Sequence, residues 1–64
     1  MTLQEIKTAV MNGKTVHWAN TSYVVICDKH NQWLIHCPSN GYTIGLTWED
    51  GVTMNGKESD FFIQ

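Results

Sequence analysis

Hydrophobic and polar residues alternate through the middle of the chain, in four runs between Thr15 and Trp48. Such alternation is typical of β-strands that bury one face of a sheet. The runs are separated by Asn20-Thr21, Lys29–Asn31 and Asn40-Gly41, whose residues favour the tight turns of β-hairpins. The pattern therefore predicts an antiparallel meander with strands at about 15–19, 22–28, 32–37 and 42–48.

The turn lengths fix the strand registers. The first turn, of two residues, sets Trp18 opposite Tyr23, and the second, a three-residue loop, sets Cys27 opposite Trp33. The third turn, again of two residues, places Trp33 opposite Trp48. Because side chains alternate across a strand, one face of the sheet is expected to form the core. That face collects Val16, Trp18, Tyr23, Val25, Cys27, Trp33, Ile35, Cys37, Ile44, Leu46 and Trp48.

The first twelve residues predict a helix at about 2–12 that docks on this face. Thr2 and Glu5 have the spacing of a capping box, and Gly13 suits the left-handed residue that ends a helix. A helix this short is marginal in water, so its apolar stripe requires a partner surface. The stripe consists of Leu3, Ile6, Ala9 and Val10.

The last residues, at about 60–64, predict a short terminal strand. The whole chain, 1–64, is then a single α+β domain, in which one helix packs on a curved antiparallel sheet of four to five strands. Closure of the sheet into a small SH3-like barrel is the main variant.

The other side of the sheet, which we call the reverse face, has an apolar centre and polar margins. Two interpretations are open: a second small core under the C-terminal segment, whose apolar residues have to be buried somewhere, or an exposed contact surface. The first is favoured because the helix already occupies the first face. The two rows expected across this face are His17, Val24, His36 and Gly45, and Thr15, Ile26, Leu34 and Thr47.

Composition narrows the classes of function. A domain of 64 residues is near the size at which a single hydrophobic core is only just sufficient to keep the chain folded. A protein partner or a self-dimer is therefore expected. The net charge is −2, and the chain has four lysines and no arginine. Nucleic acid is an unlikely partner because no basic stripe is present to neutralise phosphates.

Cys27 and Cys37 are expected to remain free thiols. The registers place them four residues apart along neighbouring strands, about 13 Å at about 3.3 Å per residue, which is too far for a disulfide. Free thiols, the lack of a secretory segment and the lack of a long apolar run predict a cytoplasmic protein without membrane contact.

No catalytic or cofactor motif is apparent, and no cofactor, metal or small-molecule substrate is predicted. His17 and His36 flank Val24 at a Cβ separation of about 9.5 Å, wide for two ligands of one metal. A metal-dependent or hydrolytic protein built on these histidines would require a further carboxylate or thiolate beside them. They are expected to be half-exposed polar residues.

If the reverse face is a contact surface, it would bind a protein partner. Gly45 would leave a notch beside His36 for a partner's side chain. The partner-binding residues predicted are His17, Val24, His36, Gly45, Ile26 and Leu34.

Three segments of the chain carry a resemblance to a group of known proteins. They are residues 13–18, 40–47 and 50–58, with the sequences Gly-Lys-Thr-Val-His-Trp, Asn-Gly-Tyr-Thr-Ile-Gly-Leu-Thr and Asp-Gly-Val-Thr-Met-Asn-Gly-Lys-Glu. In size and style the chain resembles the small uncharacterised accessory proteins carried by bacterial prophages and plasmids. The resemblance brings no functional residue with it. It implies a bacterial cytoplasmic accessory protein that acts by binding a host macromolecule, and the function expected is a non-enzymatic protein-binding module that inhibits or modulates it. The alternative is a nucleic-acid-associated accessory protein that uses the aromatic residues of the sheet.

Overall fold

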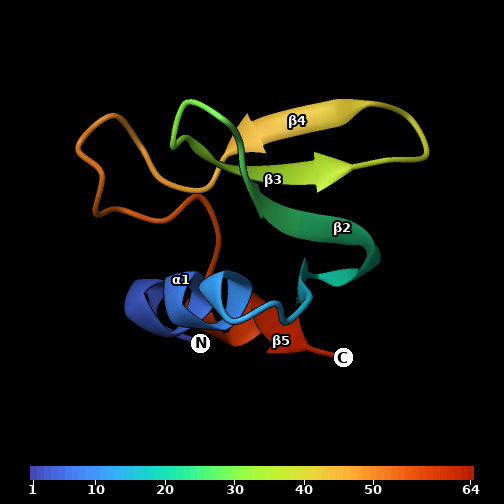
Figure 1. The fold of residues 1–64 in the computed structure, drawn as a ribbon, viewed down its shortest axis with the longest axis horizontal. Coiled ribbons are helices and arrows are strands. Elements are labelled where there is room, and N and C mark those ends of the chain that lie inside the picture. Colours follow the sequence, from blue (N-terminus) through green and yellow to red (C-terminus); the bar gives the residue numbers. More distant parts are fainter.

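The computed structural model, which covers residues 1–64, has one helix against one face of a five-stranded antiparallel sheet (Figure 1). Across the sheet the strands run in the order β4-β3-β2-β1-β5. The predicted α+β fold is confirmed, but the sheet does not close into a barrel, because β4 and β5 remain its two edges. The elements are α1 (Leu3–Met11), β1 (Val16–Trp18), β2 (Asn20–Cys27), β3 (Trp33–Cys37), β4 (Tyr42–Gly45), the short 3₁₀ helix η1 (Glu58–Asp60) and β5 (Phe61–Ile63).

The helix α1 begins at the predicted capping box. The Glu5 N–H donates to Thr2 Oγ1 over 3.1 Å, and the Thr2 N–H donates to Glu5 Oε1 over 2.7 Å. The Thr2 backbone N–H, followed by the Thr2 side chain, lowers the pKa of the Glu5 carboxyl. The helix ends where Gly13 takes a left-handed φ of 81°, so both predicted ends are confirmed.

The core lies between α1 and the predicted face of the sheet. Ile6 of the helix is fully buried and belongs to a cluster with side chains from β1, β2, β3, β5 and the segment after β4. Trp33 is only partly buried, and Trp48 is 61% exposed, so the prediction that Trp48 belongs to the core is wrong. The buried cluster consists of Ile6, Ala9, Val16, Val25, Ile35, Leu46 and Phe61.

The hairpin between β2 and β3 has the predicted register, with Cys27 opposite Trp33. Its three-residue loop ends at Asn31, which takes the left-handed φ of 63° expected of it. The Asp28 carboxylate holds the loop by accepting hydrogen bonds, each of 2.9 Å, from the N–H groups of His30 and Gln32.

The first hairpin departs from its predicted register after His17, which lies opposite Val24 as expected. Trp18 then lies opposite Asn20 instead of Tyr23, because the chain reverses at Ala19 with a left-handed φ of 66°. The Ala19 N–H donates a hydrogen bond to the Asp60 carbonyl over 2.8 Å. The chain after β1 is therefore paired with the segment that leads into β5.

The register between β3 and β4 is shifted by two residues from the predicted one. Cys37 lies opposite Tyr42, and Leu34 lies opposite Gly45, so Trp33 does not pair with Trp48. The predicted two-residue turn would have placed Pro38 inside the ladder, where it lacks an N–H to donate. A four-residue loop, closed by the Gly41 N–H on the Cys37 carbonyl at 2.9 Å, keeps the proline outside.

The C-terminal segment joins the first face rather than covering the reverse face. Met54 and Phe61 pack with the core cluster, and β5 pairs with β1, with Phe62 opposite His17. Gly56 lies so close to the Trp18 indole that a Cβ atom there would collide with it. The expectation of a second core is therefore wrong, apart from Phe62 at one margin of the reverse face.

Replacing Ala19 by glycine is expected to stabilise the protein. Relief of the left-handed conformation is worth about 1–2 kcal/mol, against about 0.4–1 kcal/mol of extra unfolded-state entropy. Denaturant unfolding should show a net gain of about 0.5–1 kcal/mol. The matched control is Asn31→Gly, where the gain should be smaller because asparagine tolerates this conformation. A loss of stability in Ala19→Gly would refute the assigned turn.

Candidate functional site

One continuous row of residues crosses the reverse face on all five strands. The residues directly opposite one another are Phe62, His17, Val24, His36 and Thr43. The structure therefore brings together three of the predicted contact residues. Because of the two-residue shift, Thr43 takes the place beside His36 that was predicted for Gly45.

The two histidines of this row differ in their surroundings. His17 is 6% exposed, its Nδ1 lies 3.0 Å from the Tyr23 carbonyl oxygen, and its ring centroid lies 5.4 Å from that of Phe62. The expectation that it is half exposed is wrong, since Phe62 of β5 covers it. His36 is partly exposed, and its Nδ1 lies 3.0 Å from Thr43 Oγ1.

Neither histidine has a nearby acidic or thiol partner. No group of three or more His, Cys, Asp or Glu side chains is close enough to hold a metal ion. Cys27 and Cys37 are both free, and Cys37 is buried. The row on the reverse face thus combines two imidazoles with a phenyl ring, an aliphatic side chain and a hydroxyl group.

Gly45 belongs to the neighbouring row, opposite Leu34, which in turn lies opposite Ile26. These three are partly exposed and lie outside the core cluster. The predicted notch beside His36 is therefore wrong, because Gly45 lies at the end of β4 and the beginning of β3, beside Leu34. There it lines a hollow of the surface.

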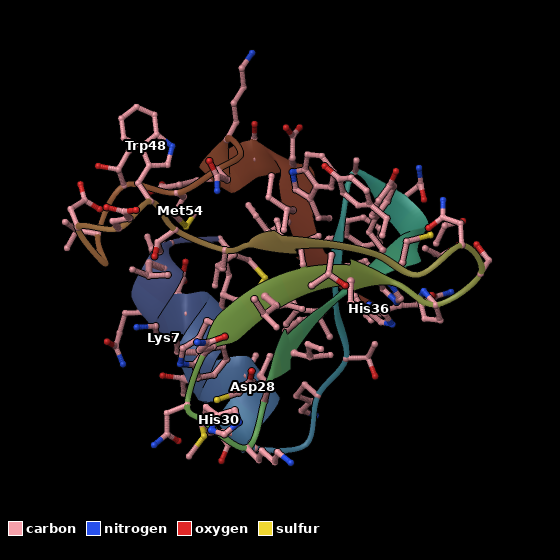
Figure 2. The ribbon with its side chains drawn as sticks, turned by 90° about the horizontal axis from the view of Figure 1, so that it is seen from above. Lys7, Asp28, His30, His36, Trp48 and Met54 are labelled. Atoms are coloured by element: carbon pink, nitrogen blue, oxygen red, sulfur yellow. The ribbon has the colours of Figure 1, made fainter.

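This surface hollow has a volume of about 570 Å³, and we call it the Trp48 hollow. Its walls combine two indoles, an ammonium, a carboxylate and two amides with the aliphatic Leu34. Two of the lining residues, Trp48 and Lys7, are labelled in the left half of Figure 2. The lining residues are Lys7, Asn31, Gln32, Trp33, Leu34, Gly45, Thr47, Trp48, Glu49 and Gly51.

The segment that presents Trp48 is ordered by its own hydrogen bonds. Thr47 forms a bridge to Met54, and the Trp48 N–H donates to the Thr53 carbonyl over 2.7 Å. Between them the chain turns at Gly51, which takes a left-handed φ of 74° and donates to the Trp48 carbonyl over 3.0 Å. The exposed indole is therefore held on a closed turn rather than on a free loop.

The Asp50 carboxylate is the centre of this turn. It accepts 2.9 Å bonds from the N–H groups of Val52 and Thr53 and a 2.6 Å bond from the Thr53 hydroxyl. The Thr53 hydroxyl, followed by the two backbone donors, holds the pKa of Asp50 below its ordinary value of 3.8. Asp50 is thus a structural anion and not a free acid for chemistry.

The opposite wall of the hollow is formed by Trp33 and α1. Lys7 Nζ lies 5.7 Å from the centroid of the Trp33 ring, a distance typical of a cation–π contact. The Trp33 indole therefore already has an intramolecular cation, whereas the structure gives Trp48 no such contact.

A side chain at Gly45 has little room at its base. A Cβ atom there would lie 3.0 Å from the Thr47 carbonyl oxygen, which is backbone and yields only with a shift of the chain. Substitution of Gly45 would therefore disturb both the fold and the hollow. A loss of binding in such a variant would not show which of the two had caused it.

No protein-family model, curated protein or solved structure matches this chain. The helix α1 is too short to cross a membrane, and no other helix is long and apolar enough to do so. The site is therefore defined by geometry alone.

The Trp48 hollow was not predicted because Trp48 was expected in the core, where Trp33 alone of the two indoles packs. One signal was available in the sequence: Pro38 conflicts with the two-residue turn on which that assignment depended. With the four-residue loop, the register of β3 and β4 ends at the pair Leu34 and Gly45, so Trp48 lies beyond the paired part of the two strands.

Replacing His17 by alanine is expected to destabilise the protein by about 2–3 kcal/mol, because it leaves the Tyr23 carbonyl without its partner and opens a cavity under Phe62. The control is His36→Ala, expected at less than about 1 kcal/mol because His36 is partly exposed. Urea unfolding of both variants measures the difference. Equal effects would show that His17 is not buried as described.

The turn around Asp50 is expected to loosen in acid. Because the folded pKa lies below 3.8, the ionised carboxylate stabilises the turn above that pH, and this contribution disappears as the pH falls through the lowered value. Thr53→Val removes the largest cause and should move the pKa of Asp50 back toward 3.8, as measured by carboxyl ¹³C NMR. An unchanged titration in this variant would exclude the hydroxyl as the cause.

Proposed function

We propose that this protein is a non-enzymatic protein-binding module and that the Trp48 hollow, with the adjoining Ile26, receives a segment of its partner. One observation carries the proposal: a tryptophan that is 61% exposed is held on a turn closed by its own hydrogen bonds. A large apolar side chain that an ordered turn presents to water is typical of an interface.

The lining of the hollow supports this interpretation. Protein interfaces combine an apolar centre that contains aromatic residues with a polar rim. Here the indoles of Trp33 and Trp48 and the side chain of Leu34 are the apolar part, and Lys7 and Glu49 are charged groups at the same hollow. A protruding side chain of the partner would bury both kinds of surface.

The pre-ordering of the turn bears on affinity. A loop that has to be ordered on binding adds an entropic penalty, whereas a turn already fixed by Asp50 does not. Trp48 is therefore the residue of this surface whose burial should contribute most to binding.

The cellular setting proposed is the bacterial cytoplasm, where such a module would modulate a host macromolecule on behalf of a mobile element. Two free cysteines, one of them buried, suit a reducing compartment. The resemblance to small accessory proteins of bacterial prophages and plasmids supports the bacterial origin and the mobile element.

The test is capture of a partner from bacterial lysate with the tagged protein and with Trp48→Ala. The variant should lose the captured protein while its circular dichroism and melting temperature stay close to those of the wild type, since the indole is mostly exposed. Met11→Ala, at a side chain 75% exposed on α1, is the control and should retain the partner. A folded Trp48→Ala protein that captures the same partner equally well would refute the proposed surface.

A further inference from the structure

Apart from its short length of three residues, the edge strand β5 has no feature that would block pairing with another chain. It consists of Phe61, Phe62 and Ile63, with no charged residue and no proline. Phe62 is 36% exposed and Ile63 is 47% exposed. Natural edge strands are protected by short length, by charged residues, proline or bulges, or by a covering element, and β5 has only the first of the features carried by the strand itself.

The hydrogen-bond alternation of the β1–β5 pair shows which backbone groups face outward. The Ala19 N–H donates to the Asp60 carbonyl over 2.8 Å, so residues 60 and 62 turn their backbone groups toward β1. Phe61 and Ile63 therefore turn theirs away from the sheet.

Three polar groups remain on this outer edge. The Phe61 N–H is already used, because it donates to the Glu58 carbonyl. One donor, the Ile63 N–H, and two acceptors, the Phe61 and Ile63 carbonyl oxygens, are left.

We propose that β5 pairs with β5 of a second copy of this chain, antiparallel about a two-fold axis that passes beside Phe62. In that register the Ile63 N–H of each copy donates to the Phe61 carbonyl of the other, so both free donors find acceptors. A strand that pairs with itself in this way gives an isologous interface that closes at two subunits.

The surroundings of the edge leave it accessible. A hollow of about 390 Å³ lies between α1 and Ile63, lined on the helix side by Thr8, Ala9 and Asn12 among others. The other edge differs: the Asn55 side-chain N–H donates to the outward Gly45 carbonyl over 2.8 Å, which occupies a group that an added strand would use.

The pairing would also extend the surface described above. Phe62 of each copy would face Phe62 of the other in a non-hydrogen-bonded pair, where side chains approach most closely. The row that runs from Thr43 to Phe62 would then continue across the axis, and the two Trp48 hollows would lie at opposite ends of one ten-stranded sheet. The dimer does not depend on the proposed function.

The first experiment measures mass by sedimentation equilibrium from micromolar to millimolar concentration. The wild type should shift from monomer to dimer, and Ile63→Lys should stay monomeric with an unchanged circular dichroism spectrum. The control is Tyr42→Lys on β4, a residue 46% exposed, which should still dimerise. A wild type that is monomeric throughout, or a Tyr42→Lys variant that alone abolishes the dimer, would overturn the proposal.

The second experiment needs no variant. Amide hydrogen exchange should protect the Ile63 N–H at high concentration and expose it on dilution, while the Phe62 N–H, bonded within the sheet, stays protected at both. A dimer whose Ile63 amide exchanges freely would place the interface elsewhere.

Discussion

The burial of one small apolar cluster on one face of the sheet determines the rest of this structure. Only nine of 64 residues are buried, and four of them, Ile6, Val16, Ile35 and Leu46, are the largest side chains with almost no contact with water. The helix at the N-terminal end of the chain and Phe61 near the C-terminal end both pack on this cluster. Because the helix and Phe61 pack on the same face, the aliphatic residues Ile26 and Leu34 of the other face stay partly exposed.

Most of the architecture could be predicted from local signals. The capping box at Thr2 and the left-handed residues at Gly13 and Asn31 are short-range effects, and each appeared where the residue type required it. The two registers that failed did so for non-local or competing reasons. The chain reverses at Ala19 because the Ala19 N–H bonds to the Asp60 carbonyl next to β5, more than forty residues away. Pro38 lies outside the strand pairing because the loop between β3 and β4 is longer than predicted.

The site illustrates how one register error propagates. The contact row of His17, Val24 and His36 was predicted correctly because the β1–β2 pairing at His17 and the β2–β3 register are as expected. The error lies between β3 and β4, where a shift of two residues keeps the β4 side chains on their predicted face. The same shift moved Gly45 into the next row and carried Trp48 past the end of β3, where the indole has no core to enter. The burial of His17 could not be foreseen either, because it depends on Phe62, whose strand position is set by pairing between distant segments.

That distant pairing has a kinetic consequence. Val16 lies opposite Ile63, so β1 becomes an interior strand only when the last residues of the chain have arrived. Loop closure over such a separation is entropically demanding, and domains dominated by non-local contacts fold more slowly than those built from hairpins alone. The β2–β3 and β3–β4 hairpins can form as soon as they leave the ribosome, whereas β1 would be left as an open edge during synthesis. The nascent protein is therefore most exposed to mispairing in the interval before its final strand is translated.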